Sequence, residues 1–165
     1  MASPATGTGA VTVRGAAAPG RSGFGPDLSL GYDSGSGQTA FGMGWSLSLP
    51  LIARKTDKGL PRYQDADESD VFILTGAEDL VPVMTGSGGE WQLERLPECT
   101  VDGVKFRVER YVPRTEGLFA RIERWTVVAT GETHWRSITR DNVTTLYGKD
   151  NNSRIFDPID PDPHK

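Results

Sequence analysis

The sequence predicts an all-β protein made of antiparallel hairpins and meanders. Glycine contributes 20 and proline 11 of the 165 residues, about 19% together against about 12% in average proteins. Both residues destabilise helix interiors, which argues against a bundle of long helices. Several short runs alternate apolar with small or polar residues, the period-two pattern of strands with one buried face. Turn-forming residues separate these runs at the spacing typical of all-β architecture.

Charge and hydropathy exclude two classes of partner. The chain has 18 basic and 22 acidic residues, a net charge of −4, whereas nucleic-acid-binding domains usually carry a basic excess. No run approaches the roughly 18 apolar residues of a spanning helix, so no insertion into a membrane is expected. The first 18 residues also lack the basic start and apolar stretch of a Sec-type signal peptide.

Composition divides the chain into three expected segments. Residues 1–18 are a Gly/Ala-rich leader, expected to be partly ordered, and residues 157–165 are a tail of alternating proline and aspartate. Proline at every second or third position removes hydrogen-bond donors, so the tail is not expected to form regular structure. The β domain is expected over residues 19–156 and is expected to be incomplete.

The first strands belong to a region with little charge. Only four of residues 1–53 are charged, namely Arg14, Arg21, Asp27 and Asp33. Leu28, Leu30 and Tyr32 alternate with small residues, and so do Trp45, Leu47 and Leu49. Residues 33–38 between the two runs are turn formers, which predicts a hairpin with a long loop.

The rest of the sequence predicts further strands, separated by loops and turns. The acidic run at residues 65–70 is expected to be a solvated loop. Asp102-Gly103 is a strong signal for a tight hairpin turn. Strands are expected at residues 51–54, 71–74, 80–84, 91–96, 104–112, 133–139 and 142–147.

One segment gives two conflicting signals. Leu118, Ile122, Trp125 and Ala129 recur at helical spacing. Residues 125–128, in contrast, are a β-prone run. Because the neighbouring segments are strands, we favour a hairpin with a bend near Glu123 and keep the helix as the alternative.

Motifs for catalysis or cofactor binding are incomplete. Residues 35–40 fit the loose dinucleotide fingerprint G-x-G-x-x-A, but a period-two strand follows where the motif requires a helix. Residues 20–24 resemble a nucleophile elbow whose last glycine is replaced by Phe24. The two asparagine sequons, Asn142 and Asn151, matter only in a eukaryotic secretory route. No catalytic or cofactor-binding residue is therefore assigned.

Metal and disulfide chemistry are also not expected. Asp65, Asp67, Glu68 and Asp70 lack the glycine and glutamate positions of an EF-hand loop. Cys99 is the single cysteine, so it has no disulfide partner, and it is expected to be a small buried apolar residue. With only His134 and His164 beside it, the chain supplies no Cys/His zinc site. The tryptophans and tyrosines are expected to pack in the core rather than to form a sugar platform.

Several stretches of the sequence resemble a known family. They are PGRSGFGPDLSL at 19–30, YDSGSG at 32–37, FGMGWSLSLP at 41–50, RKTDKGLPRY at 54–63, SDVFIL at 69–74 and GAEDLVPV at 76–83. These stretches resemble the SpvB-type N-terminal domain, which begins the B component of bacterial insecticidal toxin complexes (Tc toxins) and related virulence proteins. The resemblance is nearly continuous from residue 19 to residue 83 and looser beyond.

The resemblance implies a structural function. Members of this family contribute to a large β-sheet shell, related to RHS-repeat proteins, which with a C component encloses a toxic enzyme before delivery through an A component. The resemblance thus implies a shell and translocation subunit, or a fragment of one, made in the bacterial cytoplasm and acting outside the cell. Its implied partners are the C and A components and the continuation of its own shell, with possible self-association through open strand edges.

Two other functions compete with the shell function. A free-standing β-rich module that binds a carbohydrate or a surface receptor is the alternative, and an exposed row of aromatic side chains would favour it. An ADP-ribosyltransferase needs a Ser-Thr-Ser segment and a Glu-x-Glu pair, and the sequence has neither. The chain is therefore expected not to be an enzyme and to need no cofactor.

Overall fold

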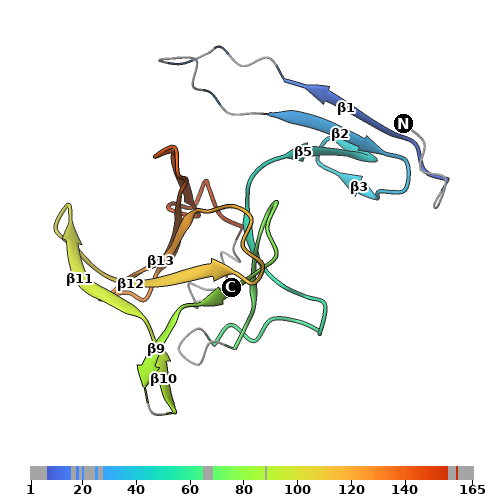
Figure 1. Ribbon diagram of the computed structural model, residues 1–165. Coiled ribbons are helices and arrows are strands. Elements are labelled where there is room, and N and C mark those ends of the chain that lie inside the picture. The colour runs from blue at the N-terminus through green and yellow to red at the C-terminus, as the bar shows by residue number, and fades with distance from the viewer. Residues whose placement is uncertain are drawn as a thin grey trace. The chain divides into compact units, whose positions relative to one another are not determined.

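The structure is a computed structural model that describes residues 7–15, 18, 20, 25, 28–64, 69–87, 89–155 and 159. All strand pairs in this part of the chain are antiparallel, which confirms the all-β prediction. The same residues contain no helix long and apolar enough to cross a bilayer. The chain divides into two compact units, Met1–Pro50 and Leu51–Lys165, and Figure 1 labels several of their strands. The predicted segment boundaries at residues 18 and 156 stay a prediction.

The first unit is a three-stranded antiparallel sheet with the order β1-β2-β5 (Figure 1). Its strands are β1 (Ala10–Arg14), β2 (Ser29–Asp33) and β5 (Trp45–Ser48). Leu30 pairs with Leu47 and Tyr32 with Trp45, which confirms the predicted hairpin. Its long loop holds a smaller hairpin of β3 (Gln38–Thr39) and β4 (Gly42–Met43).

Gly44 lets the loop return to the sheet. Its φ is +78°, and an added Cβ would lie 2.7 Å from the Tyr32 ring and 2.8 Å from the Asp33 carbonyl oxygen. The Asp33 N–H donates to the Gly44 carbonyl at 2.8 Å, and the Gly44 N–H donates to the Gly37 carbonyl at 3.0 Å. A side chain at this position would push the two strands apart, so only glycine fits here.

The register of the first sheet separates its side chains by polarity. The pairing places six apolar residues on one face: Val11, Val13, Leu30, Tyr32, Trp45 and Leu47. The opposite face carries Ala10, serine, threonine, glycine and the strand-end charges Arg14 and Asp33. Val11 and Val13 remain 54% and 51% exposed. We call the first set the apolar face of the β1-β2-β5 sheet.

The second unit is built on an eight-stranded sheet. Seven strands follow the order β15-β14-β13-β12-β8-β7-β6, and β11 also pairs with β12. Its strands are β6 (Ile52–Arg54), β7 (Phe72–Leu74), β8 (Asp79–Pro82), β11 (Arg95–Val101), β12 (Val104–Pro113), β13 (Arg121–Val127), β14 (Thr133–Ile138) and β15 (Thr144–Tyr147). β12 is long enough to pair with β13 along one edge and with both β11 and β8 along the other.

A separate hairpin leaves this sheet between β8 and β11. It consists of β9 (Met84–Ser87) and β10 (Glu90–Leu93) and projects from the rest of its unit in Figure 1. Val83 and Glu94 flank it: the Glu94 N–H donates to Val83 at 2.7 Å, and the Val83 N–H donates to Arg110 at 2.9 Å. The strands predicted at 80–84 and 91–96 are therefore each split, because the chain changes partners at these two residues.

The predicted tight turn at Asp102-Gly103 is confirmed. Asp102 has φ +51° and Gly103 φ +79°, and Val101 pairs with Val104 across them. Positive φ at both central residues is the signature of a type I′ turn, whose twist matches that of the flanking strands.

The helix kept as the alternative for residues 118–129 is wrong, and the favoured β interpretation is confirmed except for its bend near Glu123. β13 runs without a bend through Glu123 and pairs with β12 and β14 on its two sides. Ile122 and Trp125 therefore lie on opposite faces of the sheet, and Leu118 precedes the strand. A strand between two partners satisfies its backbone groups on both edges, which outweighs the helical spacing of four apolar residues.

The hydrophobic core lies on one face of the eight-stranded sheet. Its buried residues are Phe72, Leu74, Leu80, Tyr111, Ile122 and Trp135. Ile52 on β6 and Tyr147 on β15 pack against the same cluster. These are the two end strands of the sheet, so the sheet curves until both ends reach one core. The aromatic residues at 111 and 135 confirm the predicted role in core packing.

Candidate functional site

Asp70 lies in the acidic run that was predicted to be a solvated loop. Residues 65–68 lie outside the described part of the chain, but the Asp70 side chain is only 5% exposed. It accepts hydrogen bonds from the N–H groups of Arg62 and Tyr63 and from Arg54 at 2.9 Å. Burial by itself raises the pKa of Asp70, but these three donors outweigh it and hold the pKa below its usual value. For Asp70 the prediction is wrong, because this carboxylate ties the 62–63 segment to β6.

A buried ion pair borders the hydrophobic core. Arg124 donates to one carboxylate oxygen of Glu109 from Nη2 at 2.6 Å and from Nε at 3.1 Å. Both side chains are 4% exposed. The Arg124 guanidinium also lies 5.3 Å from the centre of the Tyr111 ring and 5.9 Å from that of Phe72. This arrangement fixes β12 against β13 and closes one end of the core.

A second buried carboxylate lies on the opposite face of the same strands. Glu123 has no exposed side-chain surface. Its carboxylate accepts hydrogen bonds from Arg121, from the Trp125 indole N–H at 2.9 Å and from Arg136 Nε at 3.1 Å. Arg136 in turn lies 4.8 Å over the Trp125 ring. A carboxylate held by three donors is a structural anchor, because its lone pairs are engaged inside the protein.

His134 belongs to an aromatic cluster on this second face. Its ring centre lies 5.7 Å from that of Phe106 on β12 and 5.9 Å from that of Trp125 on β13. Burial lowers the pKa of His134, and the positive charges of Lys149, Arg154 and Arg136 lower it further. The folded protein therefore favours the neutral imidazole.

We expect stability to fall with acidification through this group. Because the folded-state pKa of His134 is below the ordinary value near 6.5, the unfolded chain binds its proton first as the pH drops. The contribution of His134 is full above pH 6.5 and is lost as the pH falls towards the folded-state pKa. Urea unfolding between pH 7.5 and pH 5 measures this slope. His134→Gln should flatten it, and an unchanged slope in that variant would contradict the assignment.

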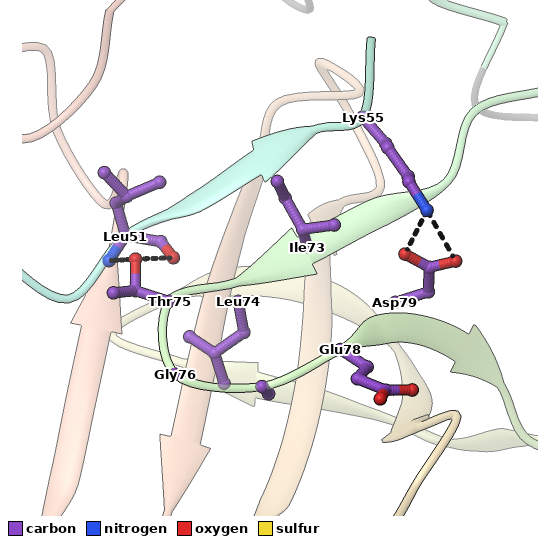
Figure 2. A pocket seen from close by; sticks show the side chains of 9 residues that line it. Leu51, Lys55, Ile73, Leu74, Thr75, Gly76, Glu78 and Asp79 are labelled. Carbon is purple, nitrogen blue, oxygen red and sulfur yellow. Dashed lines mark hydrogen bonds and ion pairs between the residues drawn. The ribbon is translucent and has the colours of Figure 1, made fainter. Parts of the chain in front are cut away.

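A surface pocket of the second unit lies where β6, β7 and β8 meet the turn at residues 75–78. Its volume is about 410 Å³, and apolar and polar side chains both line it. Figure 2 shows Lys55 reaching both carboxylate oxygens of Asp79, at 2.7 and 3.0 Å. The hydrogen bonds that Lys55 donates to the Asp79 carboxylate raise the pKa of Lys55 and lower the pKa of Asp79. Both groups therefore stay charged and paired, which leaves neither poised for proton transfer.

The structure places the sequence motifs in ordinary surroundings. The fingerprint at 35–40 forms the β2–β5 loop with its small hairpin, as expected of a loop rather than a phosphate site. Cys99 is half-buried at an irregular register of β11, so the expected full burial is wrong. Residues 21–24 of the elbow-like motif and His164 lie outside the described residues. Among the residues that are described, no group of three His, Cys, Asp or Glu side chains is placed to hold a metal.

The sequence reasoning missed the three buried charged residues, Glu109, Glu123 and Arg124. A signal was present, since each lies two residues along its strand from one large apolar or aromatic residue, namely Tyr111, Trp125 and Ile122. Such a position faces a packed layer, where a charge is stable only with a partner.

Comparison with known proteins gives the family. Residues 3–165 match the model of the SpvB family, described as the Salmonella virulence plasmid 65kDa B protein. The chain is 36% identical over 141 residues to the mono(ADP-ribosyl)transferase SpvB of Salmonella typhimurium, and equally to that of Salmonella dublin. These matches cover 82% of this chain but 23% of the relatives, so the chain spans about a quarter of their length.

Solved structures are similar over nearly the whole chain. The N-terminal domain of SpvB from Salmonella typhimurium superposes with a TM-score of 0.68 at 36% identity, over 84% of this chain and 42% of that one. TcdB2-TccC3 superposes with a TM-score of 0.78 at 29% identity, over 96% of this chain and 7% of that one. The Photorhabdus luminescens Tc holotoxin pore gives 0.78 at 31% identity with the same coverage.

These matches also test the prediction that the chain is not an ADP-ribosyltransferase. The matched SpvB structure is an N-terminal domain, and the shared segment is a minor part of the transferases. The similarity thus lies outside the catalytic domain, which confirms the prediction made from the missing transferase motifs. The SpvB family model matches residues 3–165, which is nearly the whole chain, and the chain shares an all-β fold with SpvB and Tc proteins. The chain therefore belongs to the SpvB family.

Proposed function

We propose that this chain forms part of the β-sheet shell of a Tc-type toxin complex, a structural and translocation component that helps to enclose and deliver a toxic effector. The observation that carries the proposal is the similarity to TcdB2-TccC3 and to the Tc holotoxin pore over 96% of the chain. The buried charged residues are also consistent with a structural wall, because Glu109, Glu123 and Arg124 form ion pairs that connect neighbouring strands.

The burial of the aromatic residues favours this function over a free-standing binding module. Trp135 and Tyr111 are buried in the core, and Trp45 and Trp125 are half-buried. In the described part of the chain three aromatic rings are largely exposed, Trp91 at 64%, Phe119 at 67% and Phe41 at 51%, and they lie in three separate segments, β10, the β12–β13 connection and the β3–β4 turn. A sugar platform uses several exposed rings in one plane, and this distribution gives no such row.

The proposal includes the partners and the location of the protein. Its partners are the C and A components of the toxin complex and the continuation of its own shell. The protein acts outside the bacterium. Export of the tagged protein with the complex, measured in culture supernatant against a cytoplasmic marker, tests the location separately from the shell function.

A chimera tests the shell function. Residues 1–165 replace the matching segment of TcdB2-TccC3, and the product is assayed for monodispersity and for protease protection of the enclosed effector. We expect a soluble, protected complex, because the two structures superpose over 96% of this chain with a TM-score of 0.78. The matching SpvB segment in the same position is the control for graft tolerance. A chimera that assembles and leaves the effector open to protease would contradict the proposal.

The apolar face of the β1-β2-β5 sheet predicts self-association of the isolated chain. Natural monomers cover such faces or protect their edges with charge and proline, whereas Val11 and Val13 are half exposed. We expect concentration-dependent association at micromolar concentration in sedimentation velocity. Val13→Lys should shift the chain towards monomer, and Thr12→Lys, on the opposite face of the same strand, should not. A monomer at all concentrations would favour the binding module instead.

A further inference from the structure

Three arginines surround one buried carboxylate where β11, β12 and β13 lie side by side. The carboxylate is Glu109, and the guanidinium groups belong to Arg95, Arg107 and Arg124. Register explains the convergence: Glu109 is paired with Arg95 on β11 and with Arg124 on β13, and Arg107 lies two residues away on the same face of β12. The cluster thus carries an excess of two positive charges in a chain whose net charge is −4.

Arg124 makes the short contacts with Glu109. It donates twice to one carboxylate oxygen, at 2.6 and 3.1 Å. Arg95 and Arg107 approach the other oxygen with their Nε atoms at 3.5 Å each. Both distances exceed the roughly 2.7–2.9 Å of a charge-assisted hydrogen bond. Two of the three guanidinium groups are therefore near Glu109 without being strongly bonded to it.

The guanidinium groups of Arg95 and Arg107 also have N–H donors available for a ligand. The Nε atom of Arg107 is buried and has no hydrogen-bond partner, which is a costly state for a charged donor. The remainder of the two side chains reaches solvent, with 59% of Arg95 and 43% of Arg107 exposed. Thr126 is paired with Arg107 across the β12–β13 ladder, so its side chain is on the same face. The cluster is therefore open to a ligand from the solvent side.

We propose that Arg95 and Arg107 form a binding site for a second carboxylate, supplied by an acidic segment of a partner polypeptide. Their Nε atoms both lie 3.5 Å from the same Glu109 oxygen, so the two guanidinium groups lie close together, and their solvent-facing N–H groups, rather than the buried Nε of Arg107, are the donors for the incoming carboxylate. Guanidinium forks match carboxylates in two-point contacts, and the incoming charge offsets the excess left by Arg124 and Glu109. This inference does not depend on the shell function.

Titration calorimetry of the full chain at low salt tests the site, with a hexaglutamate peptide as the probe and inorganic phosphate in a second arm. We expect the peptide to bind, and Arg95→Gln and Arg107→Gln each to weaken it about tenfold, the size of one lost charge-assisted hydrogen bond. Arg95→Lys should weaken it too, because it keeps the charge and loses the fork. Arg114→Gln is the control, since Arg114 is 61% exposed and lies at a different carboxylate, Asp79.

The outcomes separate the proposal from its rivals. Equal weakening by Arg114→Gln would mean a response to net charge alone, and would overturn the site. Tighter binding of phosphate than of the peptide would overturn the carboxylate assignment. No measurable binding of the peptide to the folded wild-type chain would overturn the proposal as a whole. Thermal unfolding of each variant shows that it is folded before its affinity is compared with that of the wild type.

Discussion

Replacing Arg124 with methionine should lower the free energy of unfolding by about 3–5 kcal/mol, because it leaves Glu109 as a buried charge without its main partner. Glu109 accepts its two shortest hydrogen bonds from Arg124, and both side chains are 4% exposed. Arg95 and Arg107 stay 3.5 Å away and are too exposed to replace a buried guanidinium. Urea unfolding followed by tryptophan fluorescence measures the change.

A double-variant cycle separates the pair from the packing around it. Arg124→Met with Glu109→Leu removes both charges and keeps the volume, and we expect it to be more stable than Arg124→Met alone, because no unpaired carboxylate remains. Arg114→Met is the control, since this exposed arginine lies 3.6 Å from Asp79 and a surface pair contributes about 0–1 kcal/mol. A loss of less than 1 kcal/mol in Arg124→Met would show that the ion pair does not hold β12 and β13 together.

Truncating Trp135 should cost about as much, roughly 3–5 kcal/mol for Trp135→Ala. The side chain is 7% exposed, and its ring centre lies 4.7 Å from that of Tyr111 and 4.8 Å from that of Phe72. These two rings belong to β12 and β7, so Trp135 on β14 joins distant strands of the sheet through the core. Its removal leaves a cavity that the rigid strands cannot close.

Trp91→Ala is the matched control for this prediction. The same atoms are deleted from a ring that is 64% exposed on the projecting β9–β10 hairpin, so little packing is lost and a change below about 1 kcal/mol is expected. Chemical unfolding of both variants under one condition gives the comparison. If both cost the same, the core would not lie where the curved sheet places it.

Local sequence patterns were sufficient to predict much of the fold. Alternation at Leu30 and Tyr32 and at Trp45 and Leu47 gave the first hairpin, since side chains on a strand point to opposite faces in turn. Asp102-Gly103 gave a type I′ turn, because both residues tolerate positive φ. The family resemblance, carried by stretches between residues 19 and 83, was likewise a property of the residues alone, and it was confirmed over residues 3–165.

Tertiary structure decided what depends on partners distant in the sequence. β13 is a straight strand because β12 and β14 lie on its two sides, and neither partner is visible in the local spacing of residues 118–129. Asp70 is buried because Arg54 and two backbone N–H groups reach it, although its neighbours in the sequence are acidic. Glu109 meets its arginines only through the register of three strands. The alternation of residues along a strand determines which face of the sheet each side chain occupies. The pairing of strands determines which residues from distant parts of the sequence it contacts there.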